Sequence, residues 1–171
     1  MSAILTTPIA VAAIVLGIAG VAKLRSPGGA KRALASTGLS VPAGVIRVIA
    51  SGELAVATLV LLMPGRAASA LLAATYALLA LVAYALARRG ASCGCFGGED
   101  TPATEAHVWL SAGIALVAAA GVVSPPQGIT WLLTGSPGVV GPLALGIAGA
   151  AYATVIAYTE LPAAWSAWRP R

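Results

Sequence analysis

Five long runs of apolar residues, separated by short polar stretches, constrain this chain more than any other feature. The runs cover about residues 3–22, 42–63, 67–87, 102–123 and 139–158. Each has close to the ~20 residues that an α-helix needs to cross a bilayer. Only 9% of the residues are charged, against about 25% in soluble domains, which is too few to wet the surface of a globule. The sequence predicts an all-α, polytopic membrane helical bundle of about five transmembrane helices, forming a single integral-membrane domain over residues 1–171.

The connections between these runs carry local signals of their own. Residues 30–35 fit either a short interfacial helix or a solvated basic loop, and both interpretations stay open. The turn at residues 64–66 predicts an antiparallel hairpin of the second and third helices. Thr101 and Pro102 predict the start of the fourth helix, with Thr101 as N-cap and Pro102 as the first helical residue.

Basic residues are distributed unevenly between the two sides that five crossings define. Lys23 and Arg25 follow the first run instead of preceding it, so we interpret that run as a retained span and not as a signal peptide. One side holds nine of the ten Lys and Arg residues: Lys23, Arg25, Lys31, Arg32, Arg47, Arg88, Arg89, Arg169 and Arg171. Only Arg66 falls on the other side. The positive-inside rule then predicts a bacterial-type cytoplasmic (inner) membrane, with the N-terminus outside and the loop at residues 90–101 cytoplasmic.

That loop holds both cysteines of the chain, Cys93 and Cys95, in the longest polar interruption of the sequence. A Cys-x-Cys pair can exchange a disulfide with another dithiol or bind a soft metal ion, and the spacing alone does not decide between them. Gly94 permits the tight turn that brings two sulfurs together. The preceding Arg88 and Arg89 favour the thiolate over the thiol. In the cytoplasm the pair would rest as a dithiol.

Other polar residues add candidates around this pair. Glu53 lies ~15 Å from the start of its helix, near the middle of the bilayer, where a carboxylate has either a functional or a packing role. His107 follows the cysteine loop and has either a packing role or a redox or ligand role. Phe96, next to Cys95, is a candidate for docking a partner. With one His and no Asp in any helix, a Ser-His-Asp hydrolase is disfavoured, and without a basic stripe so is nucleic-acid binding.

The block Cys93-Gly94-Cys95-Phe96-Gly97, placed after the third apolar run, resembles the methylamine-utilisation protein MauE family within the wider DoxX-like group. Lys23 at the end of the first helix and Glu53 in the second also fit, and the resemblance covers roughly residues 10–123. It implies a helical-bundle membrane protein linked to thiol–disulfide chemistry. In the methylamine context it implies maturation of a disulfide-rich periplasmic dehydrogenase subunit alongside a thioredoxin-like partner.

The favoured interpretation is a membrane thiol–disulfide exchange protein, a type of oxidoreductase, that supports redox maturation of partner proteins. One cysteine would attack a partner disulfide and the other would resolve the mixed disulfide. The expected partner is a thioredoxin-like protein or a disulfide-bearing client, within membrane lipid. The redox-active disulfide is the expected cofactor, and a quinone is a further candidate. Two alternatives stay open: a Cu, Hg or Zn binder or transporter with Cys93, Cys95 and His107 as ligands, and a structural membrane subunit. The oligomeric state is not predicted.

Overall fold

The computed structural model describes residues 3–96, 102–128, 135–161 and 164, and it is helical throughout. The helices are α1 (Ala3–Arg25), α2 (Gly28–Ser36), α3 (Ala43–Leu62), α4 (Arg66–Ala87), α5 (Glu105–Val123) and α7 (Pro137–Thr159). All except α2 are long and apolar enough to cross a membrane, and they correspond to the five predicted runs. The described residues contain no β-strand, so the predicted all-α fold class is confirmed.

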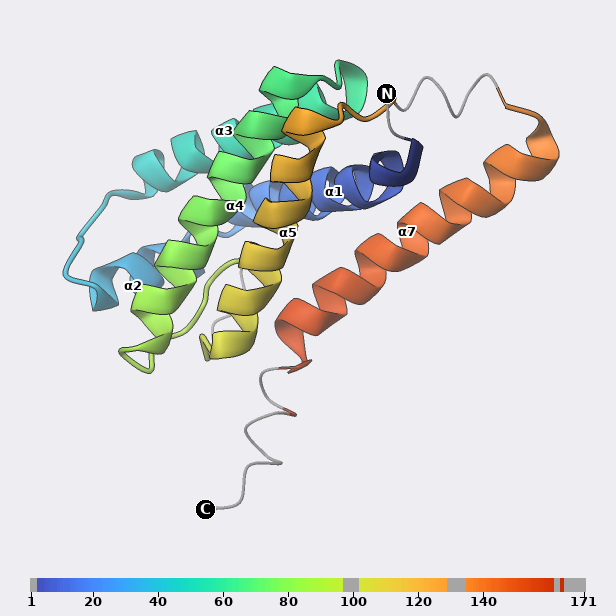
Figure 1. Ribbon diagram of the computed structural model, residues 1–171. Helices are drawn as coiled ribbons and strands as arrows, with labels where there is room; N and C mark the ends of the chain where they lie inside the picture. Colours follow the sequence, from blue (N-terminus) through green and yellow to red (C-terminus); the bar gives the residue numbers. More distant parts are fainter. Residues whose placement is uncertain (1–2, 97–101, 129–134, 162–163, 165–171) are drawn as a thin grey trace.

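The long helices pack mainly as two pairs, α1 with α3 and α4 with α5, and α7 lies along α1 (Figure 1). Small residues set the distance between α1 and α3. A Cβ added at Gly20 would lie 3.0 Å from the carbonyl oxygen of Ala50, and one at Gly17 would lie 3.5 Å from the Cβ of Ala57. Small residues of this kind let membrane helices approach closely and gain van der Waals contact.

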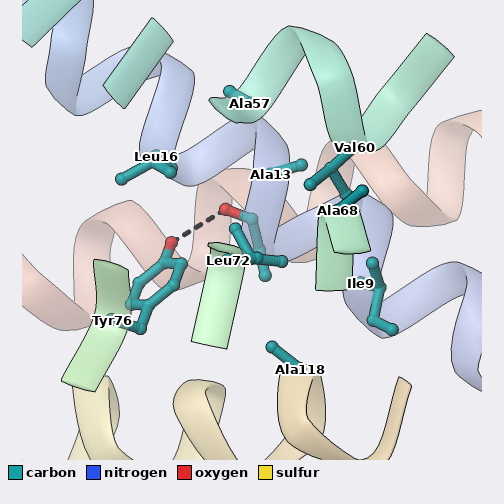
Figure 2. Close-up of a cluster of buried hydrophobic side chains, with 10 residues drawn as sticks. Ile9, Ala13, Leu16, Ala57, Val60, Ala68, Leu72, Tyr76 and Ala118 are labelled. Atoms are coloured by element: carbon teal, nitrogen blue, oxygen red, sulfur yellow. Dashed lines mark hydrogen bonds between the residues drawn. The ribbon is translucent and has the colours of Figure 1, made fainter. Parts of the chain in front are cut away.

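The two pairs meet in one apolar core (Figure 2). Its labelled members are Ile9, Ala13 and Leu16 from α1, Ala57 and Val60 from α3, Ala68, Leu72 and Tyr76 from α4, and Ala118 from α5. The buried Tyr76 hydroxyl donates a hydrogen bond of 2.8 Å to the carbonyl oxygen of Ala12. This bond joins α4 to α1 across the boundary between the pairs.

The turn before Arg66 connects α3 to α4, as the sequence predicts, but the two helices diverge from it (Figure 1). Each packs mainly against a different neighbour, α3 against α1 and α4 against α5. The predicted hairpin is therefore confined to the part of the helices near the turn. A cavity lined by residues of both helices lies between α3 and α4.

The connector between α1 and α3 folds into the short helix α2 and not into a basic loop. The helix ends at Ser36, and the chain turns two residues later at Gly38, whose φ of 90° lies in the left-handed region. The amide of Leu39 donates to the carbonyl oxygen of Leu34 at 3.1 Å, and that of Gly38 donates to Ala35 at 3.0 Å, which together make a Schellman-type stop. The Arg89 guanidinium donates to the Ser36 carbonyl at 2.8 Å, so α2 is tied to the end of α4.

The predicted start of the fourth transmembrane helix is wrong by about one turn. Pro102 is not helical but pairs with Ser92 in an isolated antiparallel bridge, and the amide of Ala103 donates to the Ala91 carbonyl at 2.8 Å. This pairing keeps the backbone extended up to Thr104, which is the actual N-cap of α5. Thr101, residues 97–100 of the cysteine loop, and Arg169 and Arg171 of the charge count lie outside the described residues.

Candidate functional site

The cysteine loop is held beneath α2 by its own backbone. Gly94 has a φ of 62°, and a Cβ there would lie 2.7 Å from the carbonyl carbon and oxygen of Gly29. Only glycine combines this conformation with so close an approach. Cys93 is buried in a cluster with Ala33 of α2, Leu86 of α4 and Ala103. These contacts fix the position of the first cysteine, since three separate segments close around it.

Cys93 and Cys95 are both free thiols, and their sulfur atoms lie 2.9 Å apart. The Cys93 thiol donates to the sulfur of Cys95. Cys93 is only 6% exposed, whereas Cys95 is partly exposed. A disulfide has an S–S bond of about 2.0 Å, so the two sulfurs need only a short approach to form one when a partner disulfide or another oxidant removes their two electrons. The arrangement suits reversible closure of a disulfide ring between them.

The two thiols differ in their tendency to ionise. The hydrogen bond that it donates, together with burial, raises the pKa of Cys93 above the usual thiol range. The same hydrogen bond stabilises the Cys95 thiolate and lowers its pKa; the nearby Lys23 ammonium acts in the same direction, and burial opposes both. Because thiolates are the nucleophiles in disulfide exchange, this difference in pKa favours Cys95 over Cys93 as the attacking sulfur.

Lys23 and Glu53 form a buried ion pair beside the thiols. The Lys23 ammonium donates to both carboxylate oxygens of Glu53, at 2.8 and 2.7 Å. Lys23 lies in the last turn of α1 and Glu53 in the middle of α3, and both side chains are almost fully buried. A buried charge is costly in a membrane protein unless it is paired with an opposite charge. Here Lys23 and Glu53 neutralise each other.

The other side of the pair is aromatic and polar. The backbone amide of Thr104 donates to Nδ1 of His107 at 3.2 Å, so the buried His107 closes a capping box at the start of α5. The ring of Tyr158 lies 5.9 Å from that of His107 and 5.8 Å from that of Phe96. The Tyr158 hydroxyl shares a 2.9 Å hydrogen bond with Ser111. Phe96 thus contacts the end of α7 within the same chain, and its proposed docking role remains a prediction.

A cavity of about 20 Å³ brings most of the predicted site residues to one place. Its polar and aromatic lining comprises Lys23, Tyr76, Cys93, Cys95, Phe96, His107, Ser111 and Tyr158. This volume is close to what one water molecule needs. Five of the six residues singled out in the sequence therefore share one cavity wall, and the sixth, Glu53, reaches it through Lys23.

Sequence reasoning missed Tyr76, Ser111 and Tyr158 as members of this site. Each lies inside an apolar run, and tyrosine near the end of a transmembrane segment normally indicates an interfacial residue. The available signal was the placement of Ser111 one turn after His107, which puts both on the same face of α5. The part of the chain described by the structure contains no group of three His, Cys, Asp or Glu residues arranged to hold a metal ion. The metal-ligand role of Cys93, Cys95 and His107 remains a prediction.

Comparison with known proteins gives one match. The family described as methylamine utilisation protein MauE matches residues 1–124 of the 171, which include α1 to α5 and the whole site except Tyr158. No curated protein and no solved structure matches the chain. With five helices suited to span a bilayer, the protein is an integral membrane protein. The extent of the match shows that the chain belongs to the MauE family.

Proposed function

We propose that this protein is a membrane thiol–disulfide exchange protein that acts on partner proteins through Cys93 and Cys95. The observation that carries the proposal is the pair of free sulfurs 2.9 Å apart, with the Cys93 sulfur donating a hydrogen bond to the Cys95 sulfur. No other cysteine is present in the chain, so the pair itself supplies both the attacking and the resolving sulfur.

The exchange follows from the asymmetry of the two thiols. The Cys95 thiolate attacks one sulfur of a partner disulfide, which breaks that bond, forms a mixed disulfide and releases the partner's other sulfur as a thiolate. Cys93 then loses its proton and attacks the Cys95 sulfur, closing the Cys93–Cys95 disulfide and releasing the partner as a dithiol. The reverse sequence oxidises a partner dithiol. Cys95 has the lower pKa and the greater exposure, which supports its role as the sulfur that meets the partner.

The partner approaches from the surface that carries Cys95. A cavity of about 90 Å³ lies against the pair there, lined by Gly94, Phe96, His107, Tyr158 and Thr159 as well as both cysteines. We propose a thioredoxin-like protein or a disulfide-bearing client as this partner. We also propose that this end faces the cytoplasm of a bacterial-type inner membrane, on the strength of the charge distribution.

The test is capture of the partner as a mixed disulfide. Cys93→Ser removes the resolving sulfur, so membranes quenched with an alkylating reagent should contain Cys95 linked to a second protein, identified by mass spectrometry. Cys95→Ser should capture less, because the buried Cys93 is a poor nucleophile. The double variant is the control and should capture nothing.

The same preparations distinguish the alternatives. Absence of a trapped protein, together with a stoichiometric soft metal in the purified wild type, would replace this proposal with metal binding. Absence of both would leave a structural subunit.

A further inference from the structure

A third and larger cavity also touches the cysteine pair. It has a volume of about 410 Å³ and fills the space where α3 and α4 diverge, with α2 closing its wide end. Most of its wall is aliphatic, for example Ile46 and Val56 of α3 and Leu79 and Leu86 of α4. The volume falls within the roughly 300–1,000 Å³ of typical small-molecule sites. The cavity is therefore large enough for a ligand that is mainly apolar.

The mouth of this cavity lies on the lipid-facing surface. Ile49 of α3 and Leu78 of α4 line it and are 47% and 61% exposed. Both belong to membrane-spanning helices, so their exposed faces contact hydrocarbon and not water. A ligand that enters here must come from the bilayer.

The inner end of the cavity is polar and holds both thiols. Lys23, Glu53, Cys93, Gly94 and Cys95 all line it. Both cysteines also line the 90 Å³ cavity, so the dithiol borders two spaces. The smaller space suits a protein partner at the loop, and the larger suits a lipid-soluble molecule. Glu53 accepts from Lys23 through both carboxylate oxygens, and a lysine ammonium has three N–H donors, so one donor is left for a further acceptor.

We propose that this cavity binds a quinone, which exchanges electrons with the Cys93–Cys95 pair. The proposal rests on the exchange function above and names its second substrate. A quinone carries two electrons, matches the apolar walls with its ring and tail, and presents carbonyl oxygens to the remaining Lys23 donor. An acyl chain would match the walls alone and would leave the polar inner end unused.

The electron and proton balance is complete with these groups. The Cys95 thiolate and the Cys93 thiol are oxidised together to one disulfide and give up two electrons. The quinone accepts both electrons and two protons, one from the Cys93 thiol and one from water at the loop surface, and leaves as the hydroquinone. A partner dithiol then reduces the disulfide by exchange, so electrons pass from the partner to the membrane carrier.

The test uses the purified full-length protein in lipid nanodiscs, reduced and freed of reductant under anaerobic conditions. Decyl-ubiquinone is added, and its loss is followed by ultraviolet absorbance while thiols are counted by alkylation and mass spectrometry. We expect one quinone reduced for each disulfide formed. A dithiol that exchanges with a partner disulfide but does not reduce decyl-ubiquinone would overturn the quinone inference and leave the exchange function in place. If the reduced Cys93–Cys95 pair reacts with no partner disulfide, the exchange function itself is refuted.

A matched pair of α3 variants tests the location. Gly52 lines the cavity, Gly44 does not, and a Cβ at either position meets no atom within 4 Å. Gly52→Leu should therefore fill the cavity without a backbone clash and slow quinone reduction at least tenfold. Gly44→Leu should reduce the quinone at the wild-type rate, and both variants should retain exchange with a partner disulfide. Equal quinone reduction by wild type and Gly52→Leu would overturn this site.

Discussion

Lys23 places its ammonium between the two carboxylate oxygens of Glu53, thirty residues further along the chain, at 2.8 and 2.7 Å. The pair joins α1 to α3 and puts a fixed positive charge beside the sulfurs. Because the carboxylate neutralises most of this charge, a change at Glu53 alters both the stability of the bundle and the environment of the thiols.

We predict that Glu53→Gln still inserts, since a neutral amide is easier to bury, but that it destabilises the bundle. Lys23 would remain buried without its counter-charge, and breaking a buried pair typically costs about 3–5 kcal/mol. Denaturant titration in mixed micelles measures the free energy of unfolding. The double variant Lys23→Met with Glu53→Gln should recover most of the loss, and Glu160→Gln, on the exposed end of α7, should be neutral. A single variant as stable as the wild type would refute the pairing.

Cys93 and Cys95 should be alkylated over different pH ranges. A lowered pKa keeps Cys95 as thiolate at pH values below the usual thiol range of about 8.5, whereas the raised pKa keeps Cys93 protonated there. Mass spectrometry can measure the rate at which iodoacetamide alkylates Cys95. This rate should therefore increase at a lower pH than the rate for a free cysteine. Cys93→Ala removes the stabilising donor, so the Cys95 profile should move to higher pH. An unchanged profile would show that the donor has no influence.

Gly94→Ala should displace the cysteine pair from under α2. The new Cβ would meet the backbone of Gly29 at 2.7 Å in addition to the strain of a positive φ. Gly90→Ala is the matched control, because Gly90 has the same φ of 62° but open space around it. We expect Gly94→Ala to expose Cys93 to rapid alkylation and Gly90→Ala to leave it protected. Equal protection in both variants would show that the close approach is unimportant.

The predicted orientation is best tested at exposed positions, since Cys93 is buried. In a background lacking both cysteines, Arg66→Cys and Arg88→Cys place single thiols at opposite ends of α4. An impermeant maleimide added to intact cells should label Arg66→Cys, and Arg88→Cys should react only after permeabilisation. The opposite pattern would reverse the orientation.

The long helices could be predicted because the length and hydropathy of each apolar run depend only on that stretch of sequence. Within this frame Gly17 of α1 packs against Ala57 of α3. The start of α5 could not be predicted, since Pro102 fits a first helical turn equally well until Ser92 pairs with it. The cavity between α3 and α4 also escaped prediction, because it depends on each helix having its main neighbour elsewhere in the chain.

The candidate site was predicted only in part, because some of its residues reach the sulfurs only through the packing of distant helices. Cys93 and Cys95 are neighbours in sequence, so their proximity follows from the loop itself. Lys23, His107 and Tyr158 come from three different helices, and only packing brings them to the sulfurs. Tyr158 in particular depends on where α7 lies beside α1, which no local pattern specifies.

The division into two helix pairs has a consequence for biogenesis. The α1–α3 pair holds the ion pair and the α2 cover, while the sulfurs enter with the loop that joins α4 to α5. During synthesis the first pair emerges from the ribosome well before the cysteines. Until the second pair docks, Cys95 lacks the Lys23 ammonium that favours its thiolate. The electrostatic environment of Cys95 is thus completed only when the two helix pairs have assembled, whereas its hydrogen bond from Cys93 forms within the loop itself.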